Sequence, residues 1–358
     1  MENNLSLMPV LEKTLEIGGS DIYIFPGANI TAKVGDHLIP LCENKLKTEE
    51  CYSLLQEIYE LADRRDLAKV EESGDDDFSF GVVKIGRFRC NAFKQRGTLG
   101  AVLRVVPFEL PEVQKLGVPD IVLDLANKKR GMVLVTGPAG SGKSTTLACI
   151  IDKINSEMSG HIITLEDPIE YIHKHKNCLV TQREVMNDTR NFAYALRAAL
   201  RQAPDVILLG EMRDFETIQI ALTTAETGHL LLSTLHTVGA SKTIDRIVDA
   251  FPAGQQQQVR VQLSLVLQAV VSQQLIPTVS GGLVAAFEVM IVDNAISNMI
   301  REGKVHQMDN AIYGGAGQGM ISMDNDILRL YKEGTISKEN ALMHAVTPDV
   351  MLKRMTQA

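Results

Sequence analysis

Short apolar runs alternate with longer amphipathic stretches over most of the chain after residue 130. Runs rich in Val, Ile and Leu predict buried strands at 132–135, 162–165, 206–209 and 230–233. Apolar positions recur with helical spacing in the intervening stretches 145–155, 192–202 and 215–227. Apolar strands separated by helices are typical of a parallel sheet that is covered on both faces. This part of the chain is therefore predicted to be an α/β domain. A late strand and a helical region are expected at 284–292 and 293–358.

Residues 1–107 have a different pattern, in which strands follow one another through short turns. Alternating segments predict strands at 21–25, 30–34, 37–41, 78–83, 87–93 and 101–106. Gly35-Asp36 is a two-residue hairpin signal, and a helix with Thr48 as its N-cap is expected to follow. The acidic run 75–77 is interpreted as an exposed turn. We expect a small α+β domain over 1–107, a linker over 108–118 and the α/β domain over 119–358.

The loop after the strand 132–135 has the pattern G-x-x-x-x-G-K-[ST]. Its residues are Gly137, Pro138, Ala139, Gly140, Ser141, Gly142, Lys143, Ser144 and Thr145. Between a strand and a helix, this pattern binds phosphate, because glycines let backbone N–H groups surround the oxygens and the helix adds its positive end. Lys143 is expected to reach the β- and γ-phosphates, and Ser144 to contact Mg²⁺. The loop therefore predicts a nucleoside triphosphate site.

Acidic and imidazole side chains flank the other predicted strands, and a phosphate-transferring site needs such groups at the carboxyl ends of its strands. Glu211 is the candidate base, although Gly210 stands where many P-loop ATPases have Asp; a capping or surface role is the alternative. Glu166 is the candidate for binding Mg²⁺ or orienting water. His229 is expected to face the nucleotide end of its strand and sense the γ-phosphate, with His236 at the opposite end. A structural role is the alternative for His229.

Charge and composition narrow the classes of function. The chain has 358 residues and a formal net charge of −8, which argues against a dedicated nucleic-acid binder. Five cysteines without a C-x-x-C pair argue against disulfides or a zinc site and favour a reducing cytoplasm. The sequence holds no run of 18 apolar residues, so no direct membrane insertion is expected.

Arginines gather in the N-terminal domain at Arg87, Arg89, Arg96 and Arg104. One interpretation makes them half-exposed strand residues with solvated head groups. The other makes them groups that complete the nucleotide site of a neighbouring subunit, where they stabilise transferred phosphoryl charge.

Four motifs, in order, closely resemble those of the secretion-superfamily hexameric ATPases, and most of all the PilT-like ATPases that retract type IV pili in twitching motility. They are the P-loop at 137–146, an acidic box at 163–170, a Walker-B-like run at 201–214 and a histidine box at 227–237. Residues 86–91 also resemble the N-terminal strand of that family. The resemblance implies a PAS-like N-terminal domain and a RecA-like motor domain. It further implies a homo-hexamer that hydrolyses ATP with Mg²⁺ at the cytoplasmic face of the inner membrane, with a pilus platform protein as partner.

The resemblance also assigns roles to individual residues. Those that match the family's nucleotide, metal, acidic-box, Walker-B, histidine-box and interface positions are Lys143, Ser144, Glu166, Glu211, His229, Arg89 and Arg104. The sequence has no cysteine after Cys178, which favours the retraction branch over extension and type II export ATPases with C-x-x-C motifs. Ser297 replaces an arginine in the retraction element at 295–301. The alternatives are therefore an extension or type II/IV secretion ATPase, or a nucleotide-gated regulatory paralogue with little turnover.

Overall fold

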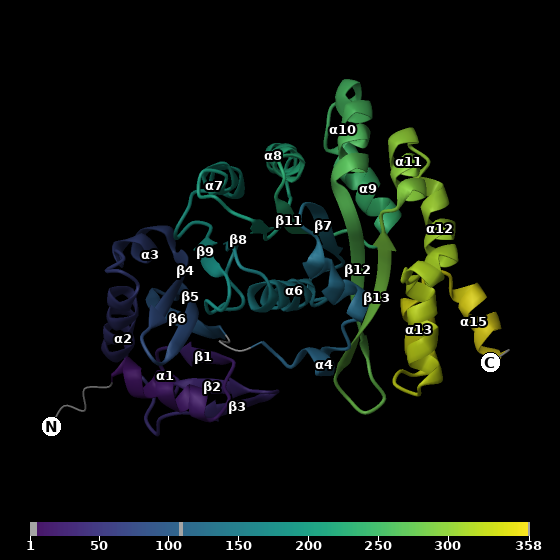
Figure 1. Ribbon diagram of the computed structural model, residues 1–358. Coiled ribbons are helices and arrows are strands. Elements are labelled where there is room, and N and C mark those ends of the chain that lie inside the picture. Colours follow the sequence, from purple (N-terminus) through teal and green to yellow (C-terminus); the bar gives the residue numbers. More distant parts are fainter. Residues whose placement is uncertain (1–5, 107–109, 357–358) are drawn as a thin grey trace. The chain divides into compact units, whose positions relative to one another are not determined.

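The computed structural model describes residues 6–106 and 110–356, which fall into two compact units (Figure 1). Of the described residues, 6–106 and 168–172 form one unit, and 110–167 with 173–356 form the other. The sequence pattern does not predict that the short segment 168–172 joins the first unit. Residues 1–5, 107–109 and 357–358, which include the end of the predicted N-terminal domain and the start of the predicted linker, lie outside the described residues.

The first unit contains a six-stranded antiparallel sheet in the order β3-β2-β1-β6-β5-β4. Its strands are β1 (Asp21–Ile24), β2 (Thr31–Val34), β3 (His37–Pro40), β4 (Asp75–Val82), β5 (Gly86–Gln95) and β6 (Thr98–Val106). Its helices are α1 (Leu7–Glu16), α2 (Thr48–Leu61) and α3 (Ala68–Ser73). Alternate residues of β5, such as Phe88 and Cys90, are buried and pack with Leu54 and Ile58 of α2 in one core. The predicted strands and the helix after residue 48 are confirmed, and α1 and α3 are additions.

Two local predictions in this unit are wrong. Residues 75–77 begin strand β4 rather than forming an exposed turn, because Asp76 points inward and is ion-paired with Arg65 and Lys69, each at 2.7 Å. Burial alone would raise the pKa of the Asp76 carboxyl, but the two cations hold it below its ordinary value. Helix α2 begins at Thr48, so Lys47 is the N-cap, and the carboxylate of Glu50 accepts a hydrogen bond from its backbone N–H at 2.7 Å.

The second unit contains a seven-stranded sheet in the order β13-β12-β7-β11-β10-β8-β9. Its strands are β7 (Gly131–Thr136), β8 (His161–Glu166), β9 (Leu179–Glu184), β10 (Val206–Leu209), β11 (Leu230–Leu235), β12 (Leu267–Pro277) and β13 (Leu283–Ile291). Neighbouring strands are parallel except for the β12–β13 hairpin. The parallel sheet and its predicted strands are confirmed. Strands β9 and β12 are additions.

Helices cover both faces of this sheet. The helices of this unit are α4 (Val113–Leu116), α5 (Asp120–Leu123), α6 (Lys143–Glu157), α7 (Phe192–Ala199), α8 (Phe215–Glu226), α9 (Ala240–Asp249), α10 (Ala253–Val266), α11 (Asn294–Glu302), α12 (Met308–Gly314), α13 (Met323–Lys332), α14 (Lys338–His344) and α15 (Pro348–Thr356). Short 3₁₀ helices lie at 124–127, 305–307 and 315–318. Alternate strand residues explain the two faces: Val133 and Val135 pack with α6, whereas Leu134 packs with residues of α7 to α10.

The last helices pack on the β12–β13 hairpin (Figure 1). Ile276 of β12 and Ala286 of β13 share a core with buried residues of α13, α14 and α15. The glycine-rich residues 314–317 lie within this helical region, because Gly314 ends α12 and the next residues form a 3₁₀ helix. A side chain at Gly315 would meet the sulfur of Met320 at 2.5 Å, so close packing accounts for a glycine there. Within the described ranges, we find no helix that could span a bilayer.

Candidate nucleotide site

The P-loop follows β7 at the carboxyl edge of the sheet and leads into α6. Two of its glycines are required by their surroundings. Gly137 has φ +143°, and a Cβ there would lie 2.2 Å from the carbonyl oxygen of Gln273. Gly142 has φ +85° as the residue before α6, and its Cβ would lie 2.8 Å from Nε2 of Gln273. Only glycine fits both positions, so the loop backbone can pack directly against β12.

The polar groups of this loop fit a phosphate ligand. The buried Lys143 ammonium donates hydrogen bonds to the carbonyl oxygens of Gly137 and Pro138, at 3.0 and 2.8 Å, so it lies across the loop where phosphates are expected. The hydroxyls of Thr136 and Ser141 are buried and have no hydrogen-bond partner within the described structure. Buried polar groups of this kind normally have a partner, and a bound ligand would supply one. Ser144 lies in the first turn of α6, where the residue is half-buried.

Glu211 lies just beyond the carboxyl end of β10, two strands from β7. Its carboxylate is largely buried and ion-paired with Arg213, and its Oε2 atom lies 3.3 Å from Nε2 of His236. Gly210 precedes it, and a Cβ at that position would lie 3.1 Å from the carbonyl oxygen of Leu165. The backbones at the ends of β10 and β8 therefore lie close together, and a side chain at position 210 would be tightly packed against β8.

Glu166 ends β8, at the same edge of the sheet as Glu211. Its Oε1 atom accepts hydrogen bonds from the Thr164 hydroxyl at 2.6 Å and from Nε2 of Gln182 at 3.3 Å. These contacts hold the carboxylate beside β8 and β9. Over residues 6–106 and 110–356, no group of three or more His, Cys, Asp or Glu side chains could hold a metal ion by itself. A metal in this site would therefore depend on ligand oxygens as well as on protein groups such as the Ser144 hydroxyl.

The expectation that His229 faces the nucleotide end of its strand is wrong. Strand β11 is parallel to β7, with Leu230 opposite Gly131 and Leu235 opposite Thr136. His229 precedes β11 and therefore lies at the amino edge of the sheet, whereas the P-loop follows β7 at the carboxyl edge. Its ring Nδ1 lies 3.2 Å from the carbonyl oxygen of Thr224, which is a local structural contact. Within one chain, the geometry gives no support to a catalytic role for His229.

His236 is the histidine at the nucleotide edge. It follows the last residue of β11, and its imidazole contacts Glu211 across the neighbouring strand end. His236 lies at the end of β11 opposite His229, as expected, but the nucleotide edge is the His236 end. The register of a parallel sheet identifies it, because every residue that follows a strand lies at the same edge as the P-loop.

The two predicted interface arginines lie within the first unit. Arg89 of β5 and Arg104 of β6 are directly opposite one another in the antiparallel register. Arg104 is ion-paired with Asp21 at 2.8 Å, and Arg89 lies 3.9 Å from Asp77. Both guanidinium side chains are still more than two-fifths exposed, and they line a cavity of about 310 Å³ with residues 168–171. Their predicted role in a neighbouring site stays a prediction.

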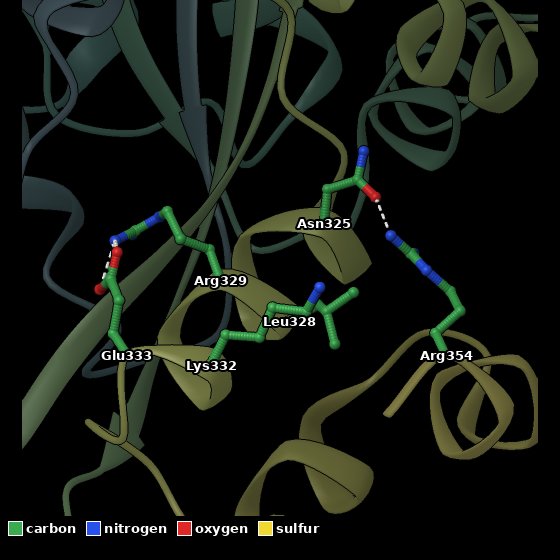
Figure 2. Close-up of a pocket in the computed structure, with 6 residues that line it drawn as sticks. All are labelled: Asn325, Leu328, Arg329, Lys332, Glu333 and Arg354. Atoms are coloured by element: carbon green, nitrogen blue, oxygen red, sulfur yellow. Dashed lines mark hydrogen bonds and ion pairs between the residues drawn. The ribbon is translucent and has the colours of Figure 1, made fainter. Parts of the chain in front are cut away.

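A second pocket, of about 430 Å³, lies on the C-terminal helices and is separate from the P-loop. Figure 2 shows its lining, which comes from α13, the residue after it and α15. Arg329 is ion-paired with Glu333 at 2.9 Å, and Arg354 donates a hydrogen bond to Asn325 at 2.7 Å. Since none of the P-loop or strand-end residues line it, this pocket does not belong to the nucleotide site.

Comparison with known proteins agrees with this geometry. Residues 3–339 match the model of the family described as type II/IV secretion system protein. The chain is 46% identical over 345 residues to the type IV pilus retraction ATPase PilT of Pseudomonas aeruginosa, covering 96% of this chain and 99% of that one. It is 42% identical over 337 residues to the type IV pilus ATPase PilU of the same organism, covering 94% and 87%.

A solved structure is similar over the whole chain. The crystal structure of the pilus retraction motor PilT with bound ADP has a TM-score of 0.89 and 47% sequence identity, covering 98% of this chain and 99% of that one. The expected fold, an N-terminal domain followed by a RecA-like ATPase domain, is confirmed. The expected nucleotide binding and ATP hydrolysis are likewise supported by these relatives. The chain belongs to the type II/IV secretion system protein family and, within it, to the PilT-like ATPases of pilus systems.

Proposed function

We propose that this PilT-like ATPase forms a ring of six copies that hydrolyses ATP and drives retraction of a type IV pilus. The observation that carries the proposal is the convergence of the P-loop, Glu211 and His236 on one edge of the sheet. The similarity to PilT over nearly the whole chain supports the retraction assignment.

In the proposed reaction, the P-loop amides and Lys143 bind the phosphates of ATP. Ser144 and Glu166, the last residue of β8, would hold Mg²⁺. When it is bound, the ion supplies positive charge at the phosphate oxygens. The Glu211 carboxylate accepts a proton from the water that attacks the γ-phosphorus, and ADP and phosphate are the products. Arg213 and His236 fix the position of that carboxylate, because each contacts one of its oxygens.

Arg89 and Arg104 would complete this site from a neighbouring copy. Their exposure and their position opposite one another on β5 and β6 support a surface that meets another subunit. The positive charge would stabilise the transferred phosphoryl group, as arginines supplied in trans do in other NTPases. ATP binding would then draw two subunits together, and release of phosphate would separate them. The ring would act at the cytoplasmic face of the inner membrane on a pilus platform protein, without inserting into the membrane or binding nucleic acid.

One observation favours a second candidate, an accessory pilus ATPase. Ser297, which replaces an arginine of the retraction element, uses its hydroxyl to bind the carbonyl oxygen of Ser264 on α10, at 2.7 Å. The serine at this position therefore joins the start of α11 to α10 by a short hydrogen bond. An accessory motor would strengthen retraction driven by another ATPase instead of driving it alone.

Deletion of the gene separates these functions. For a principal retraction motor, the deletion strain should carry excess surface pili and lose twitching, and the wild-type gene should restore both. Loss of surface pili would overturn retraction in favour of extension. Normal pilus numbers with weakened retraction would indicate the accessory role. Complementation with Glu211→Gln should fail for either motor, whereas a purely regulatory nucleotide-binding protein would still function.

A further inference from the structure

Strand β12 continues past the end of β7 and runs beside the P-loop. Ser272 pairs with Thr136, the last residue of β7, so Gln273 lies level with Gly137. The Gln273 side chain is 4% exposed, and its Oε1 atom accepts a hydrogen bond from the Thr146 hydroxyl at 2.7 Å. Thr146 is buried in the first turn of α6 and is the last residue of the P-loop motif. The Gln273 side chain of β12 therefore anchors the first turn of α6, which completes the phosphate-binding loop.

The residue before Gln273 contacts the loop that carries His236. The Ser272 hydroxyl accepts a hydrogen bond from the backbone N–H of Gly239 at 2.9 Å. Glu288, which pairs with Ser272 from β13, accepts one from Ala240 at 2.8 Å. These two N–H groups lie at the start of α9, where no helical carbonyl is available to them. The β12–β13 hairpin therefore fixes the start of α9, shortly after His236 in the sequence.

The residue after Gln273 contacts the C-terminal helices. The Gln274 amide donates from Nε2 to the carbonyl oxygen of His344 at 3.1 Å, and its Oε1 atom lies 3.1 Å from Nδ1 of the same residue. His344 ends α14, which shares a core with α13 and α15. Three successive residues thus contact α6, the start of α9 and the end of α14.

We propose that Gln273 is a positioning residue for nucleotide binding, and that Ser272, Gln273 and Gln274 transmit occupancy of the P-loop to α14. Ser272, Gln273 and Gln274 are successive residues of one strand, and all three are paired with β13. A displacement of Gln273 therefore moves Ser272 and Gln274 with it. The hydrogen bond between Thr146 and Gln273 is buried. Removing either side chain would leave the other buried without a partner, which costs free energy. The inference rests on nucleotide binding by the P-loop, so its mant-ADP and hydrogen-exchange tests do not depend on hexamer formation or on pilus retraction.

The positioning role is tested with Gln273→Met, which preserves side-chain length and removes the amide. The matched control is Gln268→Met, the same substitution on the same strand beside the start of β7, away from the P-loop. Fluorescent mant-ADP should bind Gln273→Met about three- to tenfold more weakly than wild type, as expected for one net hydrogen bond. The KM for ATP should rise with kcat changed less, and Gln268→Met should bind like wild type.

A double variant separates positioning from general loss of stability. In Thr146→Val/Gln273→Met both partners are apolar, so no buried polar group lacks a partner. It should bind mant-ADP no more weakly than Gln273→Met alone, because both changes remove the same bond. Wild-type affinity in Gln273→Met, or in the double variant if the single one does not fold, would overturn the positioning role.

Transmission to α14 is tested by amide hydrogen exchange with and without ADP. In the wild type, ADP should slow exchange over residues 338–346. In Gln274→Met this ADP-dependent slowing should disappear, while the affinity for mant-ADP changes less than twofold. Exchange that does not respond to ADP in the wild type, or that responds equally in Gln274→Met, would overturn the transmission.

Discussion

His236 Nε2 lies 3.3 Å from Glu211 Oε2, and this contact joins the carboxyl ends of two neighbouring parallel strands. The other oxygen of Glu211 is ion-paired with Arg213. A carboxylate held from both sides keeps one orientation, which a general base requires because it must lie within hydrogen-bond reach of the attacking water. Within a single chain, His236 is therefore the histidine that contacts Glu211 at the carboxyl edge of the sheet.

The first prediction compares the two histidines. His236→Asn should lower kcat for ATP hydrolysis about three- to tenfold, because it removes one contact that positions Glu211. His229→Asn should remain within about twofold of wild type, since its contacts are local to the amino edge of the sheet. Steady-state phosphate release measures both. A larger loss for His229→Asn would show that this residue acts on the site of another subunit.

The second prediction concerns the arginines of the first unit. Arg104→Ala should bind mant-ADP normally but hydrolyse ATP about a hundredfold more slowly or worse, in line with other arginines supplied in trans. Arg96→Ala, in the turn between β5 and β6, is the control and should retain activity.

Mixing variants tests whether Arg104 acts between subunits. Rings formed from Arg104→Ala and Glu211→Gln subunits contain some interfaces in which the arginine and the base are both intact. Such mixed rings should regain ATP hydrolysis that neither variant has alone. Verified mixed rings that stay inactive would mean that Arg104 acts only within its own subunit.

Much of the nucleotide site could be predicted from the sequence because its signals are local. Buried parallel strands are nearly continuous apolar runs, so β7, β8, β10 and β11 are visible as such. The P-loop pattern is also contiguous. The error on His229 arose from strand direction: in a parallel sheet, a residue before a strand and a residue after it lie at opposite edges. Applying that rule to β11 would have selected His236.

Contacts between residues far apart in the sequence could not be predicted in this way. Thr146 and Gln273 are 127 positions apart, and nothing near either residue indicates that they meet. The position of Asp76 could not be predicted for the same reason. An acidic triplet has the composition of an exposed turn, but Asp76 is buried and ion-paired with Arg65 and Lys69. Segment 168–172 joins the first unit through tertiary packing alone.

The third prediction uses the buried Asp76. Asp76→Ala should lower the free energy of unfolding by about 3 kcal/mol, because it leaves the cations Arg65 and Lys69 without their buried partner. Asp75→Ala, at an exposed neighbouring position, should change it by less than about 0.5 kcal/mol. Chemical denaturation of the two variants measures the difference. Equal stabilities would contradict the account of this ion pair.

The fourth prediction concerns pH. Burial lowers the pKa of His173 to about 4, whereas an unfolded histidine has a pKa of about 6.5. Between these values the unfolded state binds the extra proton, so stability falls as the pH decreases from about 6.5 to about 4. His173 should contribute about 2–3 kcal/mol to this loss. Denaturation of His173→Gln across this range should show a weaker pH dependence than wild type, and an identical dependence would contradict the assignment.

Steady-state phosphate release tests whether Glu211, at the carboxyl edge of the parallel sheet, acts as the base in ATP hydrolysis. The rates are measured on the proposed hexamers of wild type and Glu211→Gln after purification, with the exposed Glu216→Gln as matched control. The account predicts that Glu211→Gln releases phosphate about 10²–10³-fold more slowly while binding mant-ADP normally, and that Glu216→Gln matches wild type. Equal rates of phosphate release by wild type and Glu211→Gln in verified hexamers would contradict it.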